Sequence, residues 1–222
     1  MDLGLTGRIA LVVGGTGRIG RAVAERFELE GARVLTVARS TGFDVSDDAS
    51  VESAIASVIA EHSRIDALVV TAAPSARTLD PTKSSDPAHV LAAVDGKALG
   101  FLRVANAVIP HMVEAGYGRV IGVSGQNALV TGSIAAGLRN AALIIAAKNL
   151  ADAAAGSGVT VNVVNPGIVV EGAPAAPQRG APGEATFAQV ADLVAFLSSP
   201  LAGGVSGESI AVGHRIPGTI SL

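Results

Sequence analysis

The sequence predicts a single α/β domain in which a doubly wound parallel β-sheet carries helices on both faces. Short apolar runs rich in Val, Ile and Leu alternate with longer helical segments along all 222 residues. Strands separated by helices require a parallel sheet with right-handed crossovers, and the length suits one domain with a substantial core. Hydrophobic residues make up 49% of the chain but aromatic residues only 3%, so the core must be built mainly from aliphatic side chains.

Five elements are predicted in the first third of the chain. The apolar run Ile9–Val13 predicts a buried strand, and a glycine turn leads from it into a helix over Ile19–Leu29. Gly31 follows that helix as a C-cap glycine. The next three elements are a strand at Arg33–Ala38, a helix through Val51–Ala60 that Asp47 or Asp48 can cap, and a strand at Ile65–Thr71.

The remaining chain continues the alternation of helix and strand. Asp86 followed by Pro87 is typical of a helix start, and this helix is expected to run to Met112 with a bend near Pro110. A strand at Arg119–Ser124 and a long Ala-rich helix at Ile134–Ala155 follow. The last predicted elements are a strand at Val159–Val164 ended by a turn at Asn165-Pro166-Gly167, a mobile loop at Ala173–Gly183, a helix at Phe187–Leu197 and a strand at Ser209–Val212.

Composition excludes several classes of function. The net charge is −3 and no Lys or Arg cluster is present, which argues against nucleic acid and anionic membranes as partners. The chain has no cysteine and only four scattered histidines, so we expect no disulfide, no thiolate catalysis and no metal site. The longest apolar stretches, such as Ala141–Ala147, are shorter than the ~20 residues that cross a bilayer. A cytoplasmic protein is expected.

The most informative motif is the glycine turn between the first strand and the first helix. Gly14 allows a tight turn, Gly17 lets the backbone approach a pyrophosphate, and Gly20 lets the helix pack on the strand. The helix N-terminus adds unpaired N–H groups for phosphates. This pattern predicts a Rossmann-type dinucleotide site that also includes Thr16, Arg18 and Ile19; a glycine turn required only for packing is the alternative.

The residues after the second predicted strand indicate the choice of cofactor. The acidic residue that commonly holds the ribose hydroxyls is absent there, and the chain has Arg39 instead. Together with Arg18, Arg39 could pair with a 2′-phosphate. The pattern therefore favours NADP(H) over NAD(H), with a solvated Arg39 as the alternative.

Five motifs, in order and spacing, resemble those of the short-chain dehydrogenase/reductase family across nearly the whole chain. They are Phe43-Asp44-Val45, the segment 67–73, the strand 118–124 leading to a serine, the segment 161–167 and the segment 206–212. The resemblance implies one NAD(P)-binding domain over residues 1–222, compact because a helix after the second strand is largely missing. It also implies that Asp44, Val45, Ala72, Asn140, Pro166, Gly167 and Ile168 contact the cofactor.

The Tyr-x-x-x-Lys pair that performs catalysis in this family is missing. The resemblance places Ala136 at the tyrosine and Asn140 at the lysine, and the chain's single tyrosine, Tyr117, is expected to be a structural turn residue. The asparagine that supports a proton relay in the family falls on Lys97. In an apolar cleft the pKa of Lys97 would be depressed. The alternative is that the ammonium group of Lys97 is exposed to water. We therefore expect Ser124, Lys97 and Asn140 to be the catalytic residues.

Three kinds of function remain open at this point. The first is an NAD(P)(H)-dependent oxidoreductase that acts on a carbonyl or hydroxyl group of a small molecule with a non-standard active site. The second is a catalytically degenerate cofactor-binding protein, and the third a dehydratase, isomerase or cyclase on the same fold. The resemblance also implies a homodimer or homotetramer assembled through the predicted helices 86–112 and 134–155.

Overall fold

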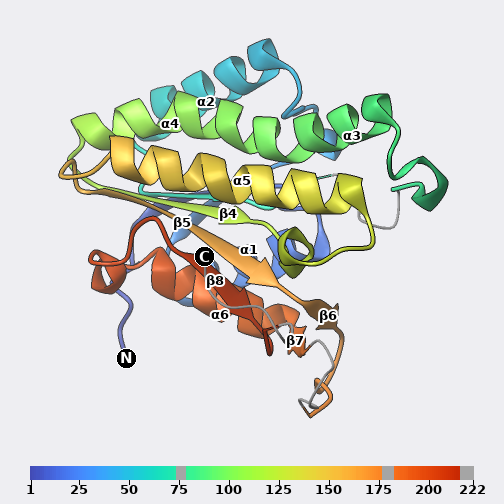
Figure 1. Ribbon diagram of the computed structural model, residues 1–222. Helices are drawn as coiled ribbons and strands as arrows, with labels where there is room; N and C mark the ends of the chain where they lie inside the picture. Colours follow the sequence, from blue (N-terminus) through green and yellow to red (C-terminus); the bar gives the residue numbers. More distant parts are fainter. Residues whose placement is uncertain (74–78, 177–182, 216–222) are drawn as a thin grey trace.

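The computed structural model describes residues 1–73, 79–176 and 183–215 and contains a six-stranded parallel sheet. Its strand order is β2-β1-β3-β4-β5-β8 (Figure 1). The predicted doubly wound parallel sheet of a single domain is therefore confirmed. The strands are β1 (Ile9–Val13), β2 (Arg33–Val37), β3 (Ala67–Val70), β4 (Gly118–Val123), β5 (Val159–Pro166) and β8 (Ser209–Val212).

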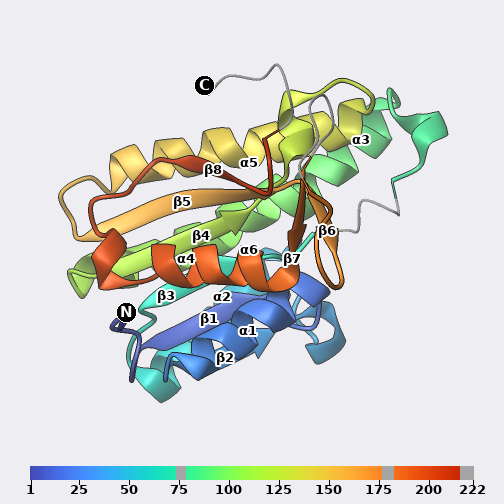
Figure 2. The same cartoon turned by 90° about the horizontal axis from the view of Figure 1, so that it is seen from below.

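Helices cover both faces of the sheet, as Figures 1 and 2 show together. One face carries α2 (Asp48–His62), α4 (Gly100–Glu114) and α5 (Ile134–Ala153), and the other carries α1 (Arg18–Leu29) and α6 (Phe187–Leu197). Alternate residues of each strand point to opposite faces, so every strand contributes to two cores. In β1, Leu11 and Val13 belong to the core under α4 and α5, whereas Val12 belongs to the core under α1 and α6.

Local sequence signals account for several element ends. Gly31, with φ 78°, follows α1; its N–H donates to the Glu28 carbonyl, and the Ala32 N–H donates to the Phe27 carbonyl. This is the hydrogen-bond pattern of a Schellman motif, as the sequence predicts. Asp47 caps α2 by accepting from the N–H of Ala49. Such ends depend on residues close in sequence, and the sequence analysis locates them to within a few residues.

The helix predicted over 86–112 is irregular at a different place from the one expected. It begins at Pro87 as α3 (Pro87–Val94), passes through a π-helical turn at Asp95–Leu99 and continues as α4 to Glu114. Pro110 lies inside α4 and does not end it. The irregular turn is the one that carries Lys97, and π-helical turns within α-helices are frequent at functional sites.

The structure also corrects the region after β5. The turn expected at Asn165-Pro166-Gly167 is in part strand, because β5 extends to Pro166. Pro166 lies beyond the last residue of β5 that pairs with β4, Val164, so the missing proline N–H costs no bond to that strand. The short strands β6 (Ile168–Val170) and β7 (Glu184–Thr186) then form a small parallel sheet that the sequence did not predict. Part of the loop expected at Ala173–Gly183, residues 177–182, lies outside the described residues.

The length of α5 differs from the expectation that no segment is long enough to cross a membrane. With 20 residues and an apolar average composition, it is long and apolar enough to do so by length and composition alone. Residues along one side of the helix, including Leu143, Ala147 and Ala151, are buried in the core of the domain. The helix also packs on β4 and β5. A helix buried in the core of a domain can have the same length and apolar composition as a membrane-spanning helix.

Tyr117 is part of a polar network at the amino-terminal edge of the sheet. Its ring lies between two guanidinium groups, with Arg8 4.0 Å and Arg119 4.4 Å from the ring centroid. Arg8 donates to Asp66 at 3.1 Å, and the buried Arg119 donates to the Ser199 carbonyl at 3.2 Å. Tyr117 therefore has the structural role expected from its position in the sequence.

Replacing Tyr117 by leucine is expected to lower the free energy of unfolding by about 1–3 kcal/mol, because two cation–π contacts are lost and the buried Arg119 loses its cover. Urea unfolding followed by circular dichroism measures the change. Tyr117→Phe keeps the ring and loses only a long hydroxyl hydrogen bond of 3.4 Å to the Ser198 carbonyl, so it should stay close to wild type. Equal losses for both variants would show that the ring stacking contributes little.

Candidate active site

The strand order places a crevice beside the carboxyl end of β1. β2 lies on one side of β1, and β3, which follows β2 in the chain, lies on the other side. The strand order therefore reverses direction at β1, and ligands of open α/β sheets bind at such a point. Gly14 ends β1 with φ 86°, and a Cβ there would lie 2.7 Å from Thr71 Oγ1 and 2.8 Å from the Ala72 nitrogen. Thr71 itself donates to the Val13 carbonyl at 3.0 Å. Only glycine fits between these two strand ends.

The same turn leaves the N-terminus of α1 open to an anion. A Cβ on Gly20 would overlap the carbonyl oxygen of Gly14, so the first turn of α1 packs directly against the end of β1. Gly17 precedes the helix with an extended backbone, no side chain caps α1, and its first turn has no acidic residue. The free N–H groups and the positive end of the helix dipole suit a phosphate.

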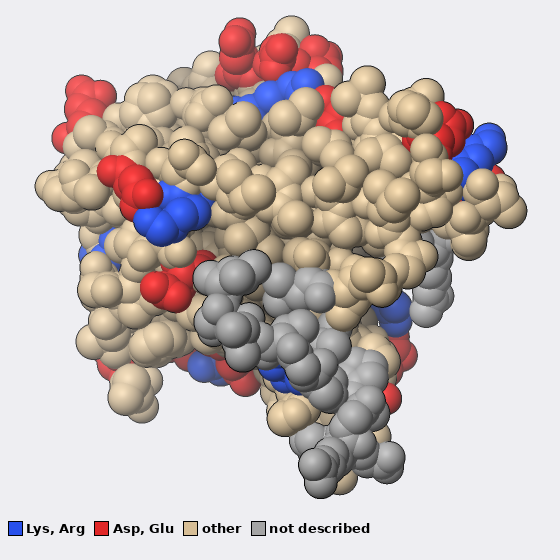
Figure 3. Space-filling view, in the orientation of Figure 1, with Lys and Arg blue, Asp and Glu red and all other residues tan. Residues whose placement is uncertain are grey.

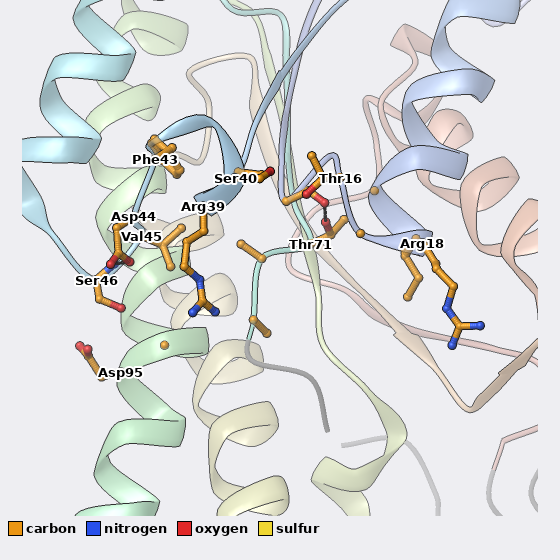
Figure 4. A pocket seen from close by; sticks show the side chains of 18 of the residues that line it. Thr16, Arg18, Arg39, Ser40, Phe43, Asp44, Val45, Ser46, Thr71 and Asp95 are labelled. Carbon is orange, nitrogen blue, oxygen red and sulfur yellow. Dashed lines mark hydrogen bonds between the residues drawn. The ribbon is translucent and has the colours of Figure 1, made fainter. Parts of the chain in front are cut away.

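A cleft of about 710 Å³ extends from this turn along the ends of β2 and β3 (Figure 4). Ten residues that the sequence predicts as cofactor contacts line it. They are Gly14, Thr16, Gly17, Arg18, Ile19, Gly20, Arg39, Asp44, Val45 and Ala72. The cleft thus brings together the glycine turn, the residues after β2 and the residue after β3, from three separate parts of the sequence.

The two arginines expected to share a 2′-phosphate lie on opposite sides of the cleft. Figure 4 shows Arg39 extended toward the side of Asp44, Ser46 and Asp95, and Arg18 at the other side. Arg18 is paired with Glu171 at 3.1 Å, and its guanidinium lies 4.9 Å from the centroid of the Phe187 ring. Among the described residues no carboxylate pairs with Arg39. In this structure Arg18 therefore does not lie beside Arg39, as the expected joint binding of a 2′-phosphate would require.

The wall of the cleft after β2 is short, as the missing family helix implies. A single 3₁₀ turn, Arg39–Thr41, separates β2 from Asp44 and Val45. Arg103 of α4 supports this wall by donating to the Val45 carbonyl at 3.4 Å and by pairing with Asp95 at 2.8 Å. The segment therefore has a fixed position although no helix precedes it.

Lys97, Ser124 and Asn140 meet in one buried cluster at the carboxyl end of β4. The ammonium group of Lys97 donates to the Ser124 carbonyl at 3.1 Å. The Ser124 hydroxyl donates to the backbone carbonyl of Asn140 at 3.0 Å, with the Asn140 Oδ1 at 3.3 Å. The Asn140 Nδ2 in turn donates to the Ala136 carbonyl at 2.9 Å. The three residues predicted to be catalytic are therefore neighbours, from three separate elements.

Burial changes the acidity of this cluster. It lowers the pKa of Lys97 from 10.5 to about 7, and the positive charge of Arg139 on α5 contributes to the shift. Burial also lowers the pKa of Arg139. Both side chains are almost fully enclosed, with 7% of Lys97 and 4% of Arg139 exposed. A lysine with this pKa exchanges its proton near neutrality, whereas the alternative of a lysine with its head in water does not fit the structure.

Four residues expected to contact the cofactor do not line the described cleft. Asn140 is buried and bonded within the cluster, and Pro166, Gly167 and Ile168 lie where β5 passes into β6. The cluster is still adjacent to the cleft, because Gly96, next to Lys97 in the chain, lines it. Tyr117 lies at the opposite end of β4 from Ser124, roughly 20 Å away at 3.3 Å per residue.

Several residues of the cleft were not singled out by the sequence analysis. Asp95, Thr71 and Phe187 line it, and Glu171 pairs with Arg18 at its rim. The sequence could have indicated Thr71, because it ends a predicted strand and precedes Ala72, an expected cofactor contact. Phe187 and Glu171 come from a distant part of the chain, and their approach depends on the small sheet of β6 and β7.

Strand order, glycine turn and cleft define a Rossmann-type α/β protein with a site for a dinucleotide at the switch point of its sheet. A family model described as Enoyl-(Acyl carrier protein) reductase matches residues 37–214. The chain belongs to the short-chain dehydrogenase/reductase family, whose members are NAD(P)-dependent oxidoreductases.

Three relatives illustrate the likeness. The 3-oxoacyl-(acyl-carrier-protein) reductase FabG of Salmonella typhimurium is 30% identical, with 93% of this chain and 96% of that protein covered. D-threitol dehydrogenase of Mycolicibacterium smegmatis is 29% identical over 76% of this chain and 73% of its own length. The crystal structure of a gluconate 5-dehydrogenase from Burkholderia cenocepacia in complex with NADP and tartrate has a TM-score of 0.84 at 19% identity, with 99% of this chain and 98% of that chain covered. The last comparison shows the fold alone.

Proposed function

We propose that the protein is an NADP(H)-dependent oxidoreductase that interconverts a carbonyl and a hydroxyl group on a small molecule, with Lys97 as the group that gives and takes the proton. The observation that carries the proposal is the buried contact between Lys97 and Ser124 beside the dinucleotide cleft. When bound, the nicotinamide supplies or accepts the hydride. The protein must then position the substrate and move one proton.

The composition of the cluster supports this assignment. The family resemblance places its catalytic lysine at Asn140 and its relay asparagine at Lys97, so the lysine and the asparagine have exchanged positions between α5 and the turn before α4. An amine and an amide are both retained around Ser124. Since Ala136 stands at the tyrosine position, Lys97 is the group in the cluster whose pKa, about 7, suits a proton donor near neutral pH.

Ser124 and Lys97 have different roles at the substrate oxygen: Ser124 holds the oxygen and Lys97 transfers the proton. The Ser124 hydroxyl has one hydrogen, which Asn140 accepts in this structure; it would turn from Asn140 to hold a carbonyl oxygen. The Lys97 ammonium has three hydrogens and uses one on the Ser124 carbonyl. In reduction Lys97 donates a proton to the oxygen and becomes neutral, and in oxidation the neutral amine accepts it.

Oxidation of NADPH in the presence of a panel of small aldehydes and ketones tests the proposal. We expect turnover in the reductive direction to fall as pH rises through about 7, because Lys97 must be protonated to donate. Binding of NADPH with no hydride transfer to any carbonyl would favour the catalytically degenerate cofactor-binding protein. Turnover without nicotinamide would favour the dehydratase, isomerase or cyclase alternative.

Arg39 is proposed to select NADP(H) over NAD(H). Arg39→Gln is expected to weaken NADPH binding about 10- to 100-fold and to leave NADH binding unchanged, because a charge-assisted hydrogen bond to the 2′-phosphate is lost. Titration followed by nicotinamide fluorescence measures both constants. Arg33→Gln is the matched control, since Arg33 is an exposed arginine of β2 that pairs with Glu61 and does not line the cleft. An equal loss for NADPH and NADH would contradict this role.

We also propose a homodimer or homotetramer that buries α5. Ile134, Leu138 and Ile145 on this helix are 52%, 49% and 63% exposed, and the face over α5 is largely uncharged (Figure 3). Exposed apolar patches of this kind mark interaction sites. A cytoplasmic location stays a prediction from the sequence.

A further inference from the structure

The π-helical turn that carries Lys97 is closed by a backbone bond of longer spacing than that of an α-helix. The Gly100 N–H donates to the carbonyl of Asp95, five residues earlier. A π turn closed in this way holds about one residue more than an α turn. Lys97 lies within the turn and donates to the Ser124 carbonyl at 3.1 Å. The direction of the Lys97 side chain therefore depends on the extra residue in this turn.

The ion pair between Asp95 and Arg103 fits a helix that contains the extra residue. With 3.6 residues per turn, residues eight apart in an unbroken α-helix lie about 80° apart around the axis, and residues seven apart about 20°. Because of the extra residue, Asp95 and Arg103, which are eight apart, lie on nearly the same face. Helical side chains lean toward the N-terminus, so Arg103 reaches back to Asp95 and meets it at 2.8 Å. The pair thus favours the π-helical form of the turn over the α-helical form.

Arg103 also connects this turn to the wall of the dinucleotide cleft. Its three guanidinium nitrogens meet three acceptors: Asp95 at 2.8 Å, Asp48 of α2 at 3.0 Å and the Val45 carbonyl at 3.4 Å. A Cβ on Gly100 would lie 2.8 Å from the Cγ2 of Val45, so the start of α4 packs directly on the same wall. A single exposed ion pair contributes little to stability, but a planar guanidinium group with three partners keeps a fixed orientation.

We propose that Arg103 is a positioning residue, which keeps the π-helical turn in the form that directs Lys97 to Ser124. The inference rests on the proposed function, in which Lys97 transfers the proton beside the cleft that Asp95 lines. Without the ion pair the turn can return to α-helical spacing. Lys97 then rotates by about 100° relative to α4, which takes its ammonium group away from Ser124. Arg103 acts through Asp95 and contacts neither the substrate nor the cofactor in this role.

The pKa of Lys97, measured in the protein without ligands, tests this role without requiring turnover. The chain has three lysines, so lysine labelled with ¹³C at Cε gives three NMR signals, and Lys97→Met identifies the signal of Lys97. Burial, with a contribution from the charge of Arg139, holds the pKa of Lys97 at about 7. Arg103→Met and Asp95→Ala should each raise this pKa toward 10.5, with at least about tenfold higher proton affinity, because the released ammonium group returns to water.

The two variants change the local charge in opposite directions. Loss of the Asp95 carboxylate by itself would lower the pKa of a neighbouring lysine, and loss of the Arg103 guanidinium group by itself would raise it. A rise in both variants is therefore explained by the release of Lys97 and not by charge alone. Arg26→Met is the matched control, since Arg26 is a partly exposed arginine of α1 that also pairs with two carboxylates. This control should leave the pKa of Lys97 unchanged.

The pH dependence of turnover gives a second readout. In the oxidation of NADPH by the carbonyl panel, Arg103→Met should lower kcat at least about tenfold and change KM little. The remaining turnover should persist to a higher pH than that of the wild type, which falls as pH rises through about 7. Arg103→Lys should restore part of kcat, because a lysine can still pair with Asp95. A loss of stability alone would not move the pH at which turnover falls.

The outcomes separate this inference from the proposed function, with circular dichroism as the check of folding. If folded Asp95→Ala or folded Arg103→Met keeps the wild-type pKa of Lys97, Arg103 only stabilises the fold and the inference is overturned. If Arg103→Met does not fold, Asp95→Ala decides the question alone. A raised pKa in both variants supports the positioning role even if no carbonyl compound oxidises NADPH, in which case the proposed function fails by itself. A pKa near 10.5 for Lys97 in the wild type overturns both.

Discussion

Replacing Lys97 by methionine is expected to stabilise the protein and to abolish its turnover. Burial holds the pKa of Lys97 near 7, whereas the unfolded chain has a lysine of pKa 10.5. Each unit of this difference corresponds to about 1.4 kcal/mol, so the protonated lysine costs on the order of 5 kcal/mol of folding free energy. Methionine has a similar shape and no charge. We expect a net gain of about 2–4 kcal/mol near pH 6, after loss of the bond to the Ser124 carbonyl.

The gain should depend on pH in a defined direction. Between about pH 7 and 10.5 the unfolded state binds more protons than the folded state, so the stability of the wild type rises with pH in this range. Below pH 7 both states are protonated at Lys97 and the cost is constant. The advantage of Lys97→Met is therefore largest at or below pH 7 and shrinks toward pH 10.

Urea unfolding of both proteins at pH 6 and pH 9.5 measures this effect. In parallel, the carbonyl panel should show a loss of turnover of about 10²- to 10⁴-fold, the usual contribution of a general acid. Lys148→Met is the control for both measurements, because Lys148 is an exposed lysine paired with Asp152. Destabilisation by Lys97→Met at pH 6 would show that Lys97 stabilises the fold, as expected of a structural lysine and not of one retained for function at a cost in stability.

Gly20→Ala is expected to abolish dinucleotide binding. The new Cβ would overlap the Gly14 carbonyl oxygen and would lie 2.9 Å from the Cα of Gly15, so the turn must move away from α1. We expect NADPH to bind at least about 100-fold more weakly and the protein to lose about 1–3 kcal/mol of stability. Gly204→Ala is the matched control, since a Cβ on Gly204 meets nothing within 4 Å.

A second variant separates lost binding from lost folding. Thr16 is exposed and lines the cleft, so Thr16→Glu should fold normally and place a negative charge near the expected phosphates. Fluorescence titration with NADPH should again show weak binding, with a wild-type melting curve. If both variants bind NADPH as well as the wild type, the glycine turn serves packing alone and the cofactor, if any, binds elsewhere.

The sequence analysis succeeds where structure is determined by residues close together in the chain. Ile9–Val13, Phe187–Leu197 and Ser209–Val212 have the same bounds in the structure as in the prediction, because apolar runs and flanking turn residues define them. The glycine turn is equally local, since Gly14 and Gly20 are required by contacts within one βα unit. The family resemblance adds the order of the motifs, and with it Ser124, Lys97 and Asn140.

The analysis fails where contacts link distant parts of the chain. Arg18 is predicted to act with Arg39, but its partner Glu171 is 153 residues away and is brought near by β6. The π-helical turn at Asp95–Leu99 replaces the expected bend at Pro110. No periodicity of the sequence predicts that Arg139, on a helix rich in Ala and Leu, would be buried.

The central claim is that the cleft after β1 binds NADP(H), and direct titration tests it most simply. Nicotinamide fluorescence is followed as the wild-type protein is added to NADPH and, separately, to NADH; the chain has no tryptophan, so its own emission does not interfere. We predict saturable binding of NADPH that is clearly tighter than that of NADH and is lost in Thr16→Glu. If neither NADPH nor NADH binds, the claim that the cleft after β1 is a nicotinamide dinucleotide site is wrong.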